Sequence, residues 1–391
     1  MVRDICSNSK YELMILSKTK HEDKKKPYLS IVLSFRNDRY QGNSLRRFHI
    51  ALDCLIYQAK RYNLDLELII VEWNPPSDRP FLKDALSWPT DLGPVTVRII
   101  TVPNEVHKRY KYFKKMNIIC APAVNVGIRR ANGKFVLSTA SGILFSNELI
   151  EFLSSEELNE DSFYRINRCD VDRKILKCSS IEQQIDFCKK NIIRVNTPLS
   201  ADRDLKNYPN LYTNASGDFI LLSRKFWHLL HGFPEFNELG LHTDGLLCYM
   251  TYLAGAKQRI LQEPMRLYHI DHDSRQAKFT KPNTRLKIFL KSRIYDRMRD
   301  DNPLKVLAKQ FVRIPRSIVF LSLQNLFPHI YEFNSDYLYW KYKKILKNML
   351  LNKRSYIFNG SDWGLPKENF EEFILSSNEK FKKYYGQKQN K

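Results

Sequence analysis

Two acidic residues in the second half of the sequence have the chemistry of a general base. Asp244 stands where a helical pattern begins, and Asp218 follows Gly217 just before an apolar run. A carboxylate close to a hydroxyl group can take its proton as the oxygen attacks, which accelerates a reaction by roughly 10²–10⁴-fold. Each residue also has a structural interpretation, Asp244 as a first-turn carboxylate stabilised by the helix dipole and Asp218 as a turn residue. The residue types alone leave both interpretations open.

A second set of polar side chains follows two apolar runs. Arg36 and Asp38 come directly after the first run, and Glu72 closes the second, before Asn74-Pro75-Pro76. Arg36 has the fork of donors that binds a phosphate through two hydrogen bonds. The two carboxylates could accept hydrogen bonds from a base or from ribose hydroxyls. Ordinary polar turns and a solvated strand end are the alternatives.

A third set combines imidazole and carboxylate groups within five residues. His269, Asp271, His272 and Asp273 form this run, whose side chains suit a divalent metal. Alternate residues of an extended strand point to opposite faces. If this stretch is extended, at most one of the His269/Asp271 pair and His272 therefore faces a site. A solvated polar loop is the alternative.

These candidates need a scaffold, and the apolar pattern predicts one. Short apolar runs separated by helical patterns are typical of an α/β fold with a mostly parallel sheet and flanking helices. In such sheets ligands bind beyond the carboxyl ends of the strands, where Arg36, Asp38 and Glu72 lie. We predict helices over residues 44–62 and 121–131, and strands over 28–35, 66–73, 95–102 and 135–139.

Several ordered segments resemble the GT-A glycosyltransferases of the family 2 type. The resemblance rests on the first two strands with their loops, on Asn125-Val126-Gly127 with the helix, turn and strand that follow, and on His242-Thr243-Asp244; it covers roughly residues 28–273. It implies transfer of a sugar from a nucleotide-sugar donor to a hydroxyl acceptor of a surface polysaccharide, glycolipid or glycoprotein glycan. It makes Asp244 the general base, with Asp218 beside the acceptor. The donor-binding residues that it implies are Ser34, Arg36, Asn37, Asp38, Glu72, Asn125, Arg129, Thr139, Ala140, Ser141 and Gly142.

One element of that family pattern is missing. Where the family carries an acidic Asp-x-Asp element that holds Mn²⁺ or Mg²⁺, this sequence has Ala140-Ser141-Gly142. A hard cation there neutralises the leaving diphosphate. The metal could instead be held by Asp218, Asp244, Asp271 or His269. Of these four residues we take His269 as the candidate metal ligand. Basic side chains could replace the metal, or the chain could be a catalytically degenerate binding or scaffold protein.

The charge of the chain favours anionic partners. The 64 Lys and Arg residues exceed the 42 Asp and Glu residues, giving +22. We do not expect nucleic acid as a partner, because no recognisable module accompanies the charge. The stretch 275–316 and the amphipathic pattern over 304–327 suit a helix on an anionic membrane surface, with a helix packed on the rest of the protein as the alternative.

The domain organisation follows these composition changes. We predict a polar basic lead over residues 1–26, a GT-A-like catalytic domain over 27–273, and a basic, mostly helical C-terminal extension over 274–391, in which Asp362-Trp363-Gly364-Leu365 is a docking turn. The seven cysteines lack a C-x-x-C pair and the start lacks the apolar block of a secretory signal. The sequence therefore predicts a cytoplasmic protein with reduced thiols, either free or peripheral on a membrane.

Overall fold

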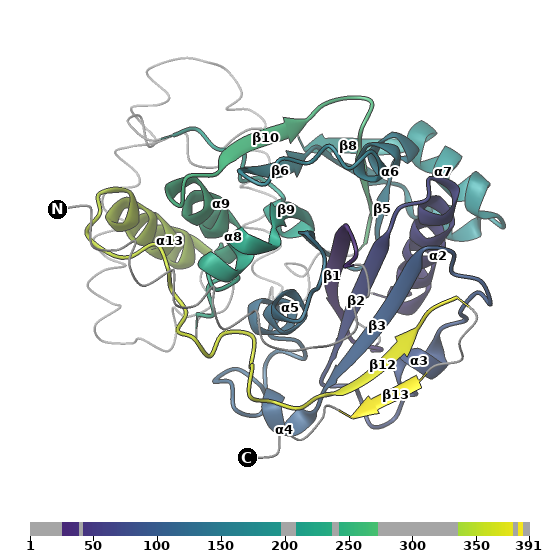
Figure 1. The fold of residues 1–391 in the computed structure, drawn as a ribbon, viewed down its shortest axis with the longest axis horizontal. Helices are drawn as coiled ribbons and strands as arrows, with labels where there is room; N and C mark the ends of the chain where they lie inside the picture. Colours follow the sequence, from purple (N-terminus) through teal and green to yellow (C-terminus); the bar gives the residue numbers. More distant parts are fainter. Residues whose placement is uncertain are drawn as a thin grey trace, which may run out of the picture.

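The main sheet of the protein is mixed but mostly parallel. The structure is a computed structural model that describes residues 26–38, 42–196, 209–236, 242–272, 335–377 and 382–385. Its larger sheet has the order β10-β6-β9-β4-β1-β2-β3-β12-β13 (Figure 1). Among the strands that the structure describes, β9 and β12 run against the direction of the others in this sheet. The predicted α/β fold is confirmed.

The strands of this sheet have the bounds β1 (Leu29–Phe35), β2 (Leu66–Trp73), β3 (Val95–Val102), β4 (Phe135–Thr139), β6 (Ser162–Ile166), β9 (Phe219–Ser223), β10 (Lys257–Leu261), β12 (Glu371–Leu375) and β13 (Lys382–Tyr385). All eight residues of β2 are buried. A continuous apolar run is what a strand needs when both faces of its sheet are covered. That requirement explains why the first four strands lie where the sequence predicts them.

Helices cover both faces of the sheet. They are α2 (Ser44–Arg61), α3 (Leu82–Ala85), α4 (Asn104–His107), α5 (Cys120–Arg129), α6 (Asn147–Ser154), α7 (Ile181–Lys190), α8 (Arg224–Leu229), α9 (Thr243–Leu253) and α13 (Ser335–Leu350). On one face Phe48 and Leu52 of α2 join Leu33 in one core cluster. On the other face Val126 of α5 and Trp227 of α8 join a second cluster. The carboxyl ends of β1 to β4 therefore emerge between two helical layers.

A smaller sheet lies beside the main one. Its order is β5 (Ile143–Phe145), β11 (Leu267–Ile270), β7 (Arg168–Val171) and β8 (Ile192–Asn196), and short 3-10 helices η1 (Arg173–Lys177) and η2 (Ser216–Asp218) flank it in sequence. Cys169 and Tyr268 point to the face that packs on Ala51 of α2. Because side chains alternate along a strand, their neighbours in sequence point to the opposite face. That opposite face carries most of the polar residues described below.

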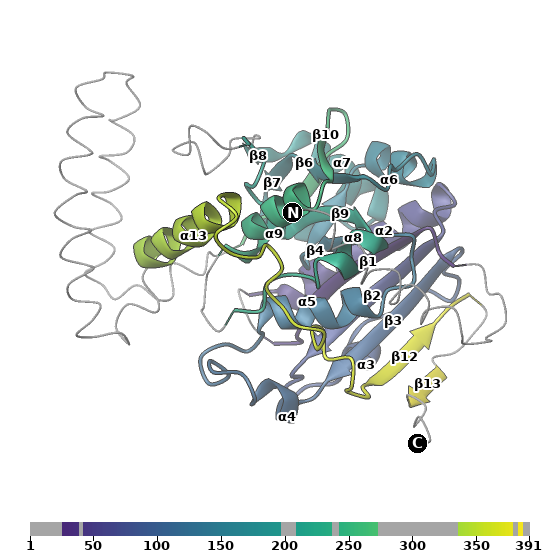
Figure 2. The ribbon, with the colours of Figure 1, turned by 60° about the vertical axis from the view of Figure 1, so that its left-hand side comes forward.

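The C-terminal part of the chain returns to the main sheet. Both ribbon views show α13 beside α9 and the following segment passing α5 to reach β12 (Figures 1 and 2). β12 pairs antiparallel with β3, so the extension supplies strands as well as a helix. The predicted docking turn does contact α5: Arg129 donates to the Trp363 carbonyl oxygen (3.0 Å), and its guanidinium lies 4.9 Å from the Trp363 ring centroid.

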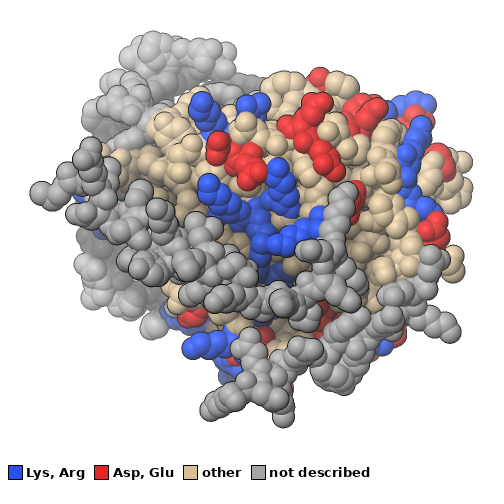
Figure 3. Space-filling model, viewed as in Figure 1, with Lys and Arg blue, Asp and Glu red and all other residues tan. Residues whose placement is uncertain are grey.

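Several predictions fall on residues outside the described ones. They include the basic stretch 275–316, the pattern over 304–327, the boundary at 273 and nearly all of the lead over 1–26. In the described ranges we find no helix with both the length and the apolar character to cross a bilayer. Figure 3 shows Lys and Arg gathered near the middle of one face, with groups of Asp and Glu close by. The described part of that face therefore carries both signs of charge.

Candidate functional site

The carboxyl ends of β1, β2 and β3 bring one group of predicted residues together. β1 and β2 are parallel with Phe35 opposite Glu72, so the residues after Phe35 lie at the same sheet edge as the end of β2. Arg36 forms an ion pair with Asp38 (Nη1 to Oδ2, 2.8 Å), and Asn117 donates to the same Asp38 oxygen (3.0 Å). The arginine and aspartate that we predicted to contact a ligand are therefore paired with each other.

Three buried polar atoms at this edge have no hydrogen-bond partner among the residues that the structure describes. They are Oδ1 of Asn37, Oε2 of Glu72 and Oγ1 of Thr101, on residues that are 2%, 1% and 7% exposed. Glu72 and Thr101 are directly paired in the β2–β3 register, so their side chains point to the same face. We call these three residues the β1–β3 edge. A buried polar atom without a partner costs free energy, so these three atoms mark the β1–β3 edge as a place with unused hydrogen-bonding capacity.

A short segment after β2 ties Asn37 and Glu72 to one place. Asn37 donates through Nδ2 to the Pro80 carbonyl oxygen (2.9 Å), and the Leu82 backbone N–H donates to Glu72 Oε1 (2.9 Å). Burial raises the pKa of Glu72 to about 7, although the Leu82 hydrogen bond opposes the rise. Glu72 therefore changes its protonation near neutral pH, and its Oε2 can accept a hydrogen bond when ionised and donate one when protonated.

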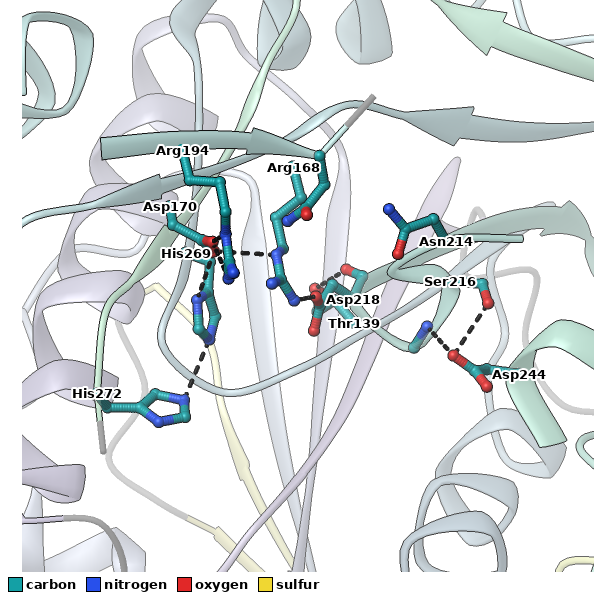
Figure 4. Close-up of polar contacts among 12 residues, drawn as sticks. Thr139, Arg168, Asp170, Arg194, Asn214, Ser216, Asp218, Asp244, His269 and His272 are labelled. Atoms are coloured by element: carbon teal, nitrogen blue, oxygen red, sulfur yellow. Dashed lines mark hydrogen bonds and ion pairs between the residues drawn. The ribbon is translucent and has the colours of Figure 1, made fainter. Parts of the chain in front are cut away.

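A second polar group lies where β4 meets the smaller sheet (Figure 4). The Arg168 guanidinium reaches Asp170 Oδ1 through Nε (3.1 Å) and Asp218 Oδ2 through Nη1 (2.6 Å). The Asp218 carbonyl oxygen accepts from Thr139 Oγ1 at the end of β4 (2.7 Å). Arg168 therefore connects the smaller sheet to the carboxyl edge of the main one.

Strand register explains the rest of this group. Asp170 of β7 lies opposite His269 of β11 on one side and Arg194 of β8 on the other. His269 Nδ1 is 3.1 Å from Asp170 Oδ1, and Arg194 Nε donates to Asp170 Oδ2 (2.5 Å). We call the set the β4–β7 cluster; its members are Thr139, Arg168, Asp170, Arg194, Asp218, His269 and His272.

The charges of the β4–β7 cluster stabilise one another. Burial alone would raise the pKa of Asp170, but the His269 hydrogen bond and the two arginines bring it down to about 2. For Arg168, burial acts to lower the pKa, and the Asp218 and Asp170 carboxylates outweigh it and raise the pKa further. The two groups therefore stay ionised at neutral pH.

Asp244 lies next to this cluster, at the start of α9. Its Oδ2 accepts from the Gly217 backbone N–H (2.8 Å) and from Ser216 Oγ (3.0 Å). A Cβ atom at position 217 would sit 3.4 Å from that oxygen, which is an ordinary contact distance, so the approach of the carboxylate does not itself require glycine. Asp218 follows Gly217 directly, and the two carboxylates that we predicted as catalytic thus flank one short turn.

The turn Ala140-Ser141-Gly142 lies beside His269. His269 is opposite Ile143 in the β5–β11 register, and the Ile270 N–H donates to the Gly142 carbonyl oxygen (3.4 Å). Gly142 has φ +80°, a left-handed conformation that favours glycine. The structure thus places the turn that lacks a carboxylate next to β11 and His269, one member of the β4–β7 cluster.

The residues of the cluster do not fit a Mn²⁺ or Mg²⁺ ion. Such ions prefer several carboxylate, carbonyl or water oxygens, but both Asp170 oxygens already face positively charged or imidazole donors. His269 contacts Asp170 through Nδ1 and His272 through Nε2 (3.1 Å to His272 Nε2). In the described ranges, no three His, Cys, Asp or Glu side chains are placed to hold one metal.

The alternation expected around His269 required an extended stretch, and this condition is not met beyond Ile270. β11 ends at Ile270, so the strand does not continue and His272 turns back to meet His269. The extended geometry that would keep the two imidazoles apart is therefore absent at this point. Asp271 does not join them, because its Oδ2 lies 3.9 Å from Arg173 Nε.

Two other predicted residues are not brought to the edge. The Asn125 side-chain amide accepts a hydrogen bond from the Phe233 N–H and donates to the Phe233 carbonyl oxygen (both 2.8 Å). It also donates to Glu235 Oε1 (2.7 Å). Arg129 is held by Trp363, as described above. Ser34 lies in β1 with an intermediate exposure. The partners of Asn125 and Arg129 are structural, and no pattern in the sequence reveals them.

Sequence reasoning also missed three members of the cluster. Arg168 and Asp170 stand two positions apart in β7, and Arg194 lies in the edge strand β8. A spacing of two between charged residues is the only signal of a shared strand face. It carries no information on which strands pair.

Comparisons with known proteins complete the description. A scan against protein-family models finds no match. A search of curated proteins finds no significant match either. Among solved structures, two crystal structures of S. aureus TarS residues 1–349, one in complex with UDP, match with a TM-score of 0.37 and 14% identity, over 62% of this chain and 60% of that chain. The matched part thus spans less than two thirds of the TarS fragment.

Proposed function

We propose that the protein is a glycosyltransferase that moves a sugar from a nucleotide-sugar donor to a hydroxyl acceptor, with Asp244 as general base. One observation carries this proposal: Asp244 accepts hydrogen bonds from the Gly217 backbone N–H and the Ser216 hydroxyl, in the turn immediately before Asp218. It brings a carboxylate from α9 to the carboxyl edge of the main sheet, where Asn37, Glu72 and Thr101 hold buried atoms without partners.

The geometry divides the work between two places. The β1–β3 edge offers acceptors for the N–H groups of a base or the hydroxyls of a ribose. The hydrogen bonds to Asp244 from described residues both fall on Oδ2, which leaves Oδ1 to receive the acceptor proton. Asp218 is fixed by Arg168 and contributes orientation and charge beside that oxygen.

The test is turnover of a panel of nucleotide sugars with the full chain. Released nucleoside diphosphate and a mass-shifted acceptor would report transfer. Asp244→Asn keeps the shape of the side chain but removes the base, so kcat should fall by about 10²–10⁴-fold while donor affinity changes little. Asp186→Asn on the surface of α7 is the matched control. No turnover across the panel, together with no nucleotide binding by calorimetry, would reject the proposal.

A second candidate function is favoured by one observation, the absence of a carboxylate in the turn after β4. It is a non-catalytic protein of the same fold that binds nucleotide sugars or serves as a scaffold. This candidate predicts nucleotide binding without turnover and no cellular effect of Asp244→Asn. The two functions therefore separate on the product assay.

The acceptor and the location are part of the same proposal. A glycan or lipid-linked acceptor and a cytoplasmic, membrane-peripheral location are supported by the basic composition, chiefly over residues 275–316. Flotation of the full chain with vesicles tests the location. Binding to vesicles with anionic lipid, but not to neutral ones, would support it, and equal recovery with both would count against it.

A further inference from the structure

The polar face of the smaller sheet carries two arginines, Arg168 and Arg194, which are paired with carboxylates that a metal ion would otherwise need. The β7–β8 register puts Arg194 opposite Asp170, and Arg168 stands two positions before Asp170, so the three side chains share one face. Figure 4 shows Arg168 between Asp170 and Asp218, with Arg194 beside Asp170. The row thus leads from β8 towards the turn that holds Asp244.

The net formal charge of this row of side chains equals that of an Asp-x-Asp element with its bound divalent cation. A divalent cation held by two carboxylates has a net charge of zero, and so does the set Arg168, Arg194, Asp170 and Asp218. The carboxylates fix the guanidiniums in place, as an Asp-x-Asp element fixes an ion. Guanidinium groups are cations with directed donors that match phosphate oxygens, and they need no bound metal.

The two arginines differ in how much of each is available. Arg168 is 20% exposed, and an Asn196 amide oriented with its oxygen towards it would accept from both Nε (3.0 Å) and Nη2 (3.1 Å). Arg194 is 64% exposed and uses Nε and Nη2 on Asp170, both on one edge of its guanidinium. Its Nη1 takes no part in these contacts, and the exposure of the side chain lets it bind an anion without breaking the ion pair.

We propose that Arg194, supported by the fixed charge of Arg168, binds the diphosphate of the donor and takes the place of a divalent cation. The inference rests on the proposed function. In the transfer step, the acceptor oxygen forms a bond to the anomeric carbon and gives its proton to Asp244. The bond from that carbon to the diphosphate oxygen breaks, and its electron pair leaves with the nucleoside diphosphate. The guanidiniums stabilise the charge that develops there.

The experiment measures binding by calorimetry on the full chain, first with EDTA and then with MnCl₂. The probes are UDP, GDP, ADP and CDP, their nucleosides, and inorganic pyrophosphate. We expect at least one nucleoside diphosphate and pyrophosphate to bind in EDTA. Arg194→Gln should weaken both by about 10–100-fold, the size of a lost charge-assisted hydrogen bond, and leave nucleoside binding unchanged. Arg194→Lys should restore part of the loss.

Arg173→Gln is the matched control, because Arg173 is an exposed arginine of η1 outside the cluster, and its affinities should equal those of the wild type. Thermal melting checks that Arg194→Gln is folded. Binding of a nucleoside diphosphate only with MnCl₂, unaffected by Arg194→Gln, would overturn this inference and leave the glycosyltransferase proposal standing. No binding of any nucleotide or nucleoside under either condition would reject both.

Discussion

The β1–β3 edge and the β4–β7 cluster lie at the same edge of the main sheet, but they differ in how fully their polar groups are paired. At the β1–β3 edge, Asn37, Glu72 and Thr101 each leave a buried polar atom without a partner. In the β4–β7 cluster, the Asp170 carboxylate alone contacts two arginines and a histidine. One region thus has unused hydrogen-bonding capacity, and the other has its charges already fixed.

The difference matches what each part of a nucleotide sugar would need. A base and a ribose bring several neutral donors and acceptors, and a site with free buried atoms gains selectivity by pairing with them. A diphosphate brings charge, and a site for charge works best when its own dipoles and ions need no rearrangement. The comparison therefore predicts that the two regions respond differently to substitution.

The largest effect is expected from Asp170→Asn. This change removes the carboxylate that Arg168 and Arg194 share. Arg168 keeps Asp218 and Arg194 is largely exposed, so the loss is that of the charge-assisted hydrogen bonds to a buried carboxylate, about 3 kcal/mol. Urea unfolding of both proteins at pH 7 measures the loss. Asp186→Asn, which removes an exposed carboxylate paired with Lys190, is the control and should stay within about 0.5 kcal/mol. A loss at Asp170 no larger than at Asp186 would show that the cluster does not stabilise the fold.

The second prediction concerns the pH dependence caused by Glu72. Its pKa is about 7 in the folded protein and has an ordinary value of 4.5. Between these values the folded state binds more protons than the unfolded state, so stability is highest below pH 4.5 and falls as the pH rises to 7. The fall is about 1.4 kcal/mol per pH unit at its steepest, roughly 3 kcal/mol in all.

Glu72→Gln removes this titration and serves as its own reference. The difference in unfolding free energy between the two proteins, measured from pH 4.5 to 8 in urea, should change in favour of Gln as the pH rises. Glu151→Gln, on the outer surface of α6, controls for general charge effects. A difference that is flat across this range would mean that Glu72 is ionised throughout and finds a partner in solution.

The sequence indicated Asn37 and Glu72 of the β1–β3 edge but not Thr101, and it missed Arg168, Asp170 and Arg194 of the β4–β7 cluster, for a physical reason. A strand covered on both faces must be apolar throughout, so Leu66–Trp73 was recognisable, and Glu72 had to lie at its end. Arg168, Asp170 and Arg194 meet only because short strands 24 residues or more apart pair in one register. No local pattern encodes that pairing.

The same limit applies to the predicted residues on α5. Asn125 and Arg129 fitted a family pattern by their spacing within a helix, but their side chains contact Glu235 and Trp363, which lie 110 and 234 residues away. Spacing within a helix shows which residues share a face. It does not show which distant segment covers that face.

The smallest effect comes from a matched pair of threonines, one from each region. Thr101 and Thr139 are both buried at or near strand ends, 7% and 5% exposed, but only Thr139 has a partner for its hydroxyl, the Asp218 carbonyl oxygen. Replacing each by Val keeps the shape. Thr139→Val should lose about 1 kcal/mol, whereas Thr101→Val should be neutral or gain up to about 1 kcal/mol, because it removes a buried polar atom that had no partner. Urea midpoints at constant slope give both values. If the Thr101 hydroxyl binds a nucleoside, Thr101→Val should in addition weaken nucleoside binding several-fold and leave pyrophosphate binding unchanged.

The stability measurement can also contradict the comparison. Equal losses of stability at the two positions would show that the Thr101 hydroxyl has a hydrogen-bond partner in solution. The two regions would then not differ in how their buried hydroxyls are paired.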